Sequence, residues 1–210
     1  MTVVPFQLGI KSNPTRYGHE GNARLINCYA EPLGEEGKNP SGIYPIPGWE
    51  TFTTVDASES TVRAMLEVDG TLYVVSGRNL YSVDAFGNAT TIGGIATDGL
   101  VTMARNRQST PEIAIVSDGL WWVCQGGVLT QGTDADLPAP IYVVEMDGYF
   151  VYLIADGRVF VSGLNDGLTI DPLAFGKADK VADGLLAGAV RGDDLILSGP
   201  RSTEFHHDVG

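Results

Sequence analysis

The segment that decides the fold is EVDGTLYVVSGRNLYSVDAFGNATTIGG, which spans residues 67–94. It contains three short runs rich in β-branched and aromatic residues, and a glycine-containing turn separates each run from the next. Such runs favour β-strands, and short turns of this kind join antiparallel neighbours. The segment therefore predicts three consecutive antiparallel strands.

The same pattern occurs four times along the chain. The turn between the second and third strands falls at Gly77, Gly119, Gly157 and Pro200, so the repeat is about forty residues long. A further candidate strand precedes each unit, and these strands are STVRAML, GLVTMAR, APIYVVE and GLLAGAV. Four strands in each repeat of this length are typical of a β-propeller blade.

The turn residues support this interpretation. Seven Asp-Gly pairs are expected to form turns, because Asp-Gly favours the left-handed conformations that two-residue hairpins require. No segment shows helical periodicity over more than a turn or two. A two-sheet sandwich would also contain short strands, but it does not predict one four-strand unit recurring at near-constant spacing. The Asp-Gly pairs begin at Asp69, Asp98, Asp118, Asp147, Asp156, Asp166 and Asp183.

The predicted fold is therefore all-β, a β-propeller of four-stranded antiparallel blades preceded by an extended Pro-rich N-terminal arm. The arm is assigned to residues 1–58 and the blades to residues 59–210. The fourth unit is one strand short, so either the chain is part of a longer one or residues 43–55 supply the missing outer strand. The blades are expected at about 60–97, 98–138, 139–183 and, incomplete, 184–210.

A set of apolar residues is expected to be buried between blades. Trp121 and Trp122 are neighbours in one candidate strand, so their side chains should point to opposite faces, one toward each adjacent blade. Core packing explains this pair better than sugar stacking does. The predicted core is Leu72, Tyr73, Val74, Ile113, Ile115, Trp122, Val143, Tyr149, Val151, Val159, Leu195 and Ile196.

The arm is predicted from NCYAEPLGEEGKNPSGIYPIPGWETF, residues 27–52. Its prolines and glycines exclude a helix and argue against a pairing strand of ordinary length. Its apolar residues are nevertheless too many for a solvated linker. We expect an extended segment lying along a surface, with residues 50–55 as a candidate edge strand. The expected contact residues are Tyr29, Tyr44, Ile46 and Trp49.

Composition restricts the possible partners. The chain has 26 acidic and 13 basic residues and a formal net charge of −13, which argues against non-specific duplex binding and points to protein partners. We also expect no sequence-specific binding of nucleic acid. No run reaches the roughly 18 apolar residues of a membrane span, and no secretory signal is present, so a soluble product of a reducing compartment is expected. Cys28 and Cys124 could form a disulfide, but two buried free thiols are the favoured interpretation.

Sequence signatures of catalysis are missing. The chain contains no GxSxG, GxxxxGK[ST] or HExxH motif, so we expect no enzymatic activity and no cofactor. Glu204, His206 and Asp208 would share one strand face and form a conceivable metal site, but no second ligand cluster supports it and we expect no metal. Asp134 and Asp136 lack the Gly and Glu of a calcium loop and are interpreted as an acidic turn.

Two segments resemble one family, the tail accessory factors or packaged-DNA stabilisation proteins of short-tailed bacteriophages. The segment NARLINCYAEPLGEEGKNPSGIYPIPGWETF is similar to the N-terminal pattern of that family, and GLLAGAVRGDDLILSGPRSTEFHHDVG is similar to a later segment. Between the two, the blade hairpins are similar in pattern. The matching residues are Asn27, Ala30, Pro32, Ser41, Gly42, Pro47 and Gly48 in the first segment and Ser202, Thr203, Glu204 and Phe205 in the second.

The resemblance implies a structural virion protein of the tail or neck, assembled in the bacterial host cytoplasm. It implies a homo-oligomeric ring of about six copies below the portal and adaptor proteins. Such a ring helps retain packaged DNA and supports tail needle, spike or fibre proteins. Family members are longer, so the chain resembles their N-terminal half or a shortened relative.

Two other functions fit the same fold. A carbohydrate-binding or carbohydrate-active propeller would expose Trp121 or Trp122 for sugar stacking and would need paired carboxylates in the central funnel. A cellular propeller scaffold without a viral link would need neither feature.

Overall fold

The computed structural model describes residues 25–32, 41–58, 61–178, 180–181 and 183–207. Every regular element in these ranges is a β-strand, as predicted for an all-β chain. The described part of the chain contains no helix that is long and apolar enough to cross a membrane. The contacts divide the chain into two units, which we call the arm unit (residues up to Thr51) and the blade unit (from Phe52 onward).

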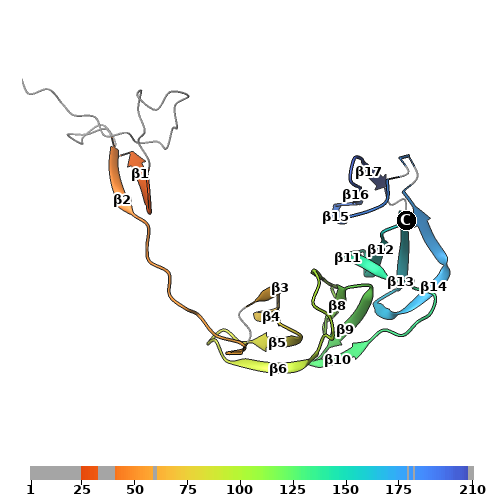
Figure 1. Cartoon of the computed structure of the whole chain (residues 1–210), viewed down its shortest axis with the longest axis horizontal. Helices are drawn as coiled ribbons and strands as arrows, with labels where there is room; N and C mark the ends of the chain where they lie inside the picture. Colours follow the sequence, from red (N-terminus) through yellow and green to blue (C-terminus); the bar gives the residue numbers. More distant parts are fainter. Residues whose placement is uncertain (1–24, 33–40, 59–60, 179, 182, 208–210) are drawn as a thin grey trace, which may run out of the picture. The chain divides into compact units, whose positions relative to one another are not determined.

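The blade unit consists of four antiparallel sheets, called blades 1 to 4, whose strands follow one another in chain order (Figure 1). Blade 1 comprises β3 (Val62–Val68), β4 (Thr71–Ser76), β5 (Asn79–Val83) and β6 (Ala89–Gly94). Blade 2 comprises β7 (Val101–Arg105), β8 (Glu112–Ser117), β9 (Leu120–Gln125) and β10 (Val128–Gln131). Blade 3 comprises β11 (Pro140–Met146), β12 (Tyr149–Ile154), β13 (Arg158–Gly163) and β14 (Asp166–Lys177). Blade 4 contains three described strands, β15 (Ala187–Arg191), β16 (Asp194–Ser198) and β17 (Thr203–His207).

The repeat predicted from the sequence is confirmed. Gly77, Gly119 and Gly157 each lie in the turn between the second and third strands of a blade, and Pro200 lies in the corresponding turn of blade 4. The first strands contact one another in succession, β3 with β7, β7 with β11 and β11 with β15. The first strands therefore line one side of the row of blades, as the innermost strands of a propeller do.

Four of the seven Asp-Gly pairs lie in turns between paired strands, and three of these are two-residue turns. Asp69, Asp118 and Asp147 have φ angles of 50°, 49° and 51°, and the glycines that follow them are also left-handed. Two successive left-handed residues between paired strands form a type I′ turn. Asp156 and Gly157 also lie in the turn between β12 and β13, although only Gly157 is left-handed. The prediction is wrong for the other three pairs, because Asp98 and Asp183 lie in loops between blades and Asp166 begins β14.

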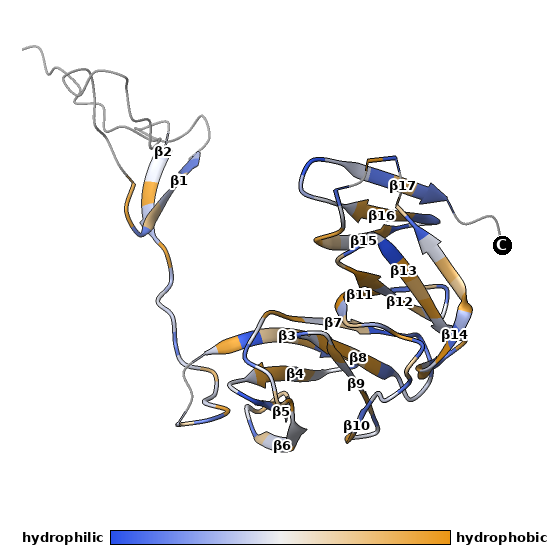
Figure 2. Ribbon diagram, turned by 45° about the vertical axis from the view of Figure 1, so that its right-hand side comes forward, coloured by the Kyte–Doolittle hydropathy of each residue, from blue (hydrophilic) through white to orange (hydrophobic). Residues whose placement is uncertain are grey.

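The described residues form three hydrophobic core clusters, one at each junction between consecutive blades. Trp122 packs in the cluster between blades 1 and 2, with residues such as Val75 and Leu80. Trp121 packs in the cluster between blades 2 and 3, with residues such as Phe150 and Tyr152. The two indoles therefore face opposite neighbours, as predicted. Figure 2 shows hydrophobic residues concentrated on middle strands such as β8 and β12.

Most of the predicted core is buried. Tyr149 is the exception, because it follows the β11–β12 turn directly and its side chain is 37% exposed. Leu72, Tyr73, Leu195 and Ile196 are half-buried. The buried members are Val74, Ile113, Ile115, Trp122, Val143, Val151 and Val159.

One side chain joins blades 1 and 2. The Arg63 guanidinium, on β3, donates hydrogen bonds to the Gly77 carbonyl at 2.8 Å and to the Thr97 carbonyl at 2.7 Å. It also donates to the Gly99 carbonyl at 2.6 Å and to the Ser117 hydroxyl at 2.8 Å. These acceptors belong to the β4–β5 turn, the interblade loop and the end of β8, so Arg63 connects three segments.

The arm unit contains a hairpin, although the prolines and glycines of this segment argued against a pairing strand of ordinary length. Its strands are β1 (Cys28–Pro32) and β2 (Ser41–Pro45), which pair antiparallel with Tyr29 opposite Tyr44. Pairing is tolerated because of where the prolines lie. The Ile46 N–H donates to the Asn27 carbonyl at 2.9 Å, and hydrogen-bonded and non-hydrogen-bonded pairs alternate in an antiparallel ladder. Pro32 and Pro45 therefore occupy non-hydrogen-bonded positions, where a missing N–H costs no ladder bond.

One further expectation about the arm is corrected. Residues 50–55 form no strand. Residues 52–58 instead bind blade 1 through side chains. The Thr53 hydroxyl donates to the Gly87 carbonyl at 2.7 Å, and the Tyr81 hydroxyl donates to the Asp56 carboxylate at 2.7 Å. The unit boundary therefore differs from the expected position at residue 58.

Candidate functional site

The predicted contact residues of the arm are exposed. Tyr29 and Tyr44 are brought together across the hairpin, with ring centroids 5.9 Å apart, and their side chains are 48% and 39% exposed. Ile46 follows β2 and is 49% exposed, whereas Trp49, beyond the hairpin, is 99% exposed. An exposed cluster of large apolar residues is typical of an interaction surface.

Among the described residues of the arm unit, the two strands β1 and β2 form a two-stranded sheet. A cross-strand aromatic pair such as Tyr29 and Tyr44 contributes only about 0.2–1 kcal/mol. An isolated two-stranded hairpin is marginally stable in water, because it has no second layer against which to bury its side chains.

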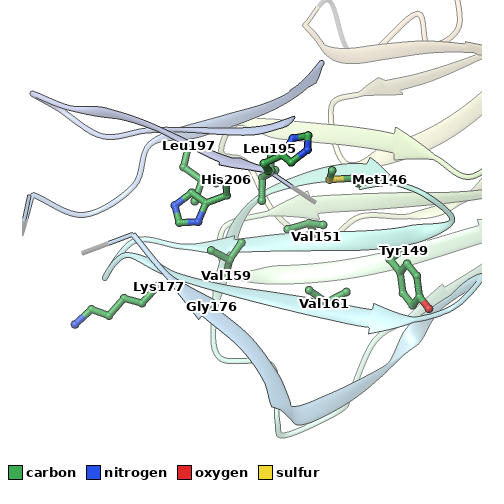
Figure 3. Close-up of a pocket in the computed structure, with 11 residues that line it drawn as sticks. Met146, Tyr149, Val151, Val159, Val161, Gly176, Lys177, Leu195, Leu197 and His206 are labelled. Atoms are coloured by element: carbon green, nitrogen blue, oxygen red, sulfur yellow. The ribbon is translucent and has the colours of Figure 1, made fainter. Parts of the chain in front are cut away.

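A cleft of about 350 Å³, which we call the interblade cleft, lies between blades 3 and 4 (Figure 3). Val151 and Val159 of blade 3 and Leu195 of blade 4 form its apolar walls. Lys177, at the end of β14, and His206, on β17, lie at its rim. Its volume lies in the range of about 300–1,000 Å³ that is typical of ligand sites.

The conceivable metal site on β17 is occupied by other interactions. Glu204 is buried and accepts a hydrogen bond from the Lys180 backbone N–H at 3.0 Å, and its other oxygen lies 3.3 Å from His206 Nε2. Asp208 lies outside the described residues. Within the described ranges, no group of three His, Cys, Asp or Glu residues could hold a metal ion.

The acidic turn at residues 133–138 has a structural role. Asp134 accepts hydrogen bonds from the backbone N–H groups of Asp136 at 3.0 Å and Ile170 at 3.1 Å. Its carboxylate therefore ties the loop between blades 2 and 3 to β14. This use of both oxygens fits the interpretation as an ordinary acidic turn.

Both cysteines are free thiols, as the favoured interpretation held. Cys124 is buried in the cluster between blades 1 and 2, and burial raises the pKa of its thiol. Cys28, on β1, is only half-buried, so the expectation that both would be buried is wrong for it.

Glu112 is a buried carboxylate that the sequence did not single out. Its side chain is at the end of β8 and accepts a hydrogen bond from the Gly167 N–H on β14 at 3.0 Å. The Asn106 side chain accepts a bond from the Glu112 N–H at 2.8 Å, and the Tyr152 hydroxyl donates to the Gly167 carbonyl at 2.8 Å. Burial raises the pKa of Glu112, and the nearby charge of Asp166 adds to this effect. The hydrogen bond between the Glu112 carboxylate on β8 and the Gly167 N–H on β14 therefore joins blades 2 and 3.

Glu112→Gln is expected to stabilise the protein increasingly as pH rises. The folded-state pKa of Glu112 is above its unfolded value, so its contribution is present at low pH and is lost as pH rises through the folded pKa. Glutamine keeps an acceptor for the Gly167 N–H and has no charge to desolvate. Urea unfolding of both proteins between pH 4 and 8 measures this difference. A variant that becomes relatively less stable as pH rises would contradict the assignment.

Both tryptophans that could stack on sugars are inside the fold. Trp121 is 4% exposed and Trp122 is 3% exposed, and each packs between two blades. Neither indole presents a face to solvent. The main sequence feature in favour of carbohydrate binding is therefore explained by core packing.

Comparison with protein families gives a match along almost the whole chain. The family model described as "Bacteriophage P22 Gp10, beta-propeller" matches residues 5–210. The chain belongs to this family. Membership in the P22 Gp10 family makes it a β-propeller protein with a structural role in a bacteriophage, as the sequence resemblance implied. No match is found among curated proteins.

Solved structures similar to this P22 Gp10 family member agree on the fold. The computationally designed Ika8 protein is 11% identical, with 88% of this chain and 57% of that chain covered and a TM-score of 0.58. The designed Ika4 protein is 11% identical, with 76% and 99% covered and a TM-score of 0.57. YCF48 bound to D1 peptide is 12% identical, with 78% and 56% covered and a TM-score of 0.52. At these identities the likeness concerns the fold alone.

Proposed function

We propose that this chain is a non-enzymatic tail hub or head-completion protein of the virion, which assembles as a ring below the portal and adaptor. In this role it helps retain packaged DNA and anchors tail fibres, spikes or the needle. The observation that carries the proposal is the P22 Gp10 family match over residues 5–210. The ring is a homo-oligomer of about six copies, in line with the closed symmetry of most homo-oligomers.

The composition supports a role based on shape and position. A formal net charge of −13 gives a surface that repels DNA, because phosphate binding needs clustered Lys and Arg. A protein with such a surface can surround or close a DNA channel without binding the DNA. Its stable partners are then proteins, namely other copies of itself, the portal and adaptor, and tail proteins.

The arm supports assembly through its exposed residues. Trp49 and Ile46 follow the β1–β2 hairpin, and both side chains are exposed. Large aromatic residues are common binding anchors, and prolines restrict the unbound chain, which lowers the entropy lost on docking. The arm therefore serves as a docking segment between subunits or between the ring and the adaptor.

Deletion of residues 1–51 tests this role. The cut removes β1 and β2 together and follows the boundary between the two units. We expect the blades to retain their circular dichroism spectrum and melting temperature, because the three core clusters lie in the blade unit. We also expect oligomerisation and binding to a purified portal–adaptor complex to weaken at least tenfold in sedimentation experiments.

The opposite result would remove the arm from the interface. If the truncated chain assembles and binds the portal–adaptor complex with unchanged affinity, the docking surface lies on the blades. If the full-length protein binds glycans and does not bind the portal–adaptor complex, the carbohydrate function is favoured instead.

A further inference from the structure

The interblade cleft and the arm complement each other in shape and polarity. The cleft has apolar walls and a polar rim, and the arm carries one indole, Trp49, that is 99% exposed. An indole has an apolar body and a single N–H donor, so it suits a pocket that is apolar inside and polar at the mouth. The cleft volume of about 350 Å³ is sufficient for a side chain of this kind.

We propose that the interblade cleft binds Trp49 of a second copy of this chain, with Glu50 facing Lys177 at the mouth. The inference rests on the proposed ring and names the contact that closes it. Each subunit then provides one arm and one cleft, and such head-to-tail contacts generate a ring when the rotation between copies closes.

Charge complementarity favours the arm as the occupant. The chain has twice as many acidic as basic residues, yet the residues that line the cleft include Lys177, His206 and His207 and no Asp or Glu. Each histidine already faces a carboxylate, His206 that of Glu204 and His207 that of Asp194. Lys177 is the lysine of the lining; it interacts electrostatically with Asp156, at the β12–β13 turn, and it is the cation that Glu50 would face. Glu50 follows Trp49 directly, so its carboxylate reaches the rim when the indole enters.

Chain length assigns the arm to a second copy. Thr53 is bonded to Gly87 at the β5–β6 turn of blade 1, and the four residues from Thr53 back to Trp49 span at most about 14 Å. Packed sheets lie about 10 Å apart, so the space between blades 3 and 4 is about 25 Å from blade 1. Trp49 cannot cross that distance within its own chain.

Gly176 offers a way to fill the cleft without disturbing the fold. It lies opposite Val159 in the β13–β14 ladder, and directly opposed residues project their side chains to the same sheet face. Val159 lines the cleft, and so does Gly176 (Figure 3). A Cβ added at Gly176 meets no heavy atom within 4 Å. Gly176→Phe therefore places a ring where the indole would bind.

A mixing experiment with two full-length variants tests the proposal. In sedimentation velocity, wild-type protein is expected to assemble. Trp49→Ala and Gly176→Phe are each expected to remain monomeric at concentrations at least tenfold higher than the concentration at which wild-type protein assembles. An equimolar mixture of the two variants forms 1:1 dimers, because the intact arm of Gly176→Phe enters the intact cleft of Trp49→Ala. Matched controls are Gly176→Ala, which leaves the cleft open, and Phe86→Ala, which removes another exposed aromatic side chain. Both controls assemble as wild type does.

The possible outcomes separate this contact from the proposed ring. If wild type assembles and both variants assemble equally well, the ring stands and the Trp49 contact is wrong. If the variants are monomeric but their mixture does not form dimers, the arm does not cross to a second copy. If wild type is monomeric at every concentration, both the ring and this contact are wrong.

A charge exchange provides a second test that needs no bulky substitution. Glu50→Lys and Lys177→Glu are each expected to weaken self-association by up to about fivefold, as surface ion pairs do. The double variant restores the pair in reverse and recovers wild-type association. Weakening in both single variants without recovery in the double variant would contradict the pairing. Equal association in all four proteins would also contradict it.

Discussion

Trp122→Ala is expected to lower the free energy of unfolding by about 3–5 kcal/mol, the range measured when large aromatic side chains are removed from packed cores. Trp122 is 3% exposed and packs with Val75, Leu80 and Ile115 between blades 1 and 2. The surrounding side chains come from two separate sheets, which cannot close the cavity without moving one blade toward the other. Urea unfolding followed by circular dichroism measures the loss.

Phe86→Ala is the matched control, because a large aromatic side chain is removed from a position that is 89% exposed. We expect a change within about 0.5 kcal/mol for this substitution. A loss below about 1 kcal/mol in Trp122→Ala would contradict the packing between blades. The carbohydrate interpretation of the tryptophan pair would then regain support.

Arg63→Met is expected to cost about 2–4 kcal/mol, because it leaves several acceptors at the junction of blades 1 and 2 without a donor. Methionine keeps much of the apolar stem but cannot donate to the carbonyls of Gly77, Thr97 and Gly99 or to Ser117. Ser117 and Thr97 are buried, so water does not readily replace the guanidinium there. The substitution should also speed hydrogen exchange in residues 95–100, which connect the two blades.

Arg105→Met is the control for charge. Arg105 forms a surface ion pair with Asp69 at 2.9 Å, and both side chains are substantially exposed. Removal of such a pair costs less than about 1 kcal/mol. Equal losses in the two variants would show that Arg63 contributes through its charge alone and not through its bonds to three chain segments.

The repeat was predictable because local rules determine it. A blade strand must alternate its side chains, so neighbouring Trp121 and Trp122 had to face opposite junctions. Gly77, Gly119 and Gly157 recur at near-constant spacing because each blade reverses direction at the same point. These properties depend on a few adjacent residues, and they are visible without knowing what lies across the sheet.

The Asp-Gly turns that were predicted wrongly depend on residues that are distant in the sequence. In LNDG, residues 164–167, the sequence favoured an Asp-Gly turn, but the left-handed residue is Asn165 and Asp166 begins β14. Gly167 is needed for packing, because a Cβ there would lie 2.9 Å from both the Phe150 and Val123 side chains. The identity of those neighbours follows from the packing of two blades and is not visible in the four residues.

The structure of the arm also depends on pairing that local sequence does not reveal. Proline counts alone argued against pairing, whereas the register places Pro32 and Pro45 where no donor is needed. The four arm contact residues could be proposed from their type, but their partner surface could not. The interblade cleft likewise brings residues from β12 to β14 together with residues from β16 and β17. Only the packing of two blades creates it.

Electron cryomicroscopy of the phage whose genome encodes this chain is the most direct test of its proposed role as a tail hub. We expect a closed ring of these propellers on the tail axis, directly below the adaptor, with each arm reaching the adjacent copy. Density for the protein away from the tail axis, or particles that lack it while retaining their packaged DNA, would contradict the assignment as a tail hub.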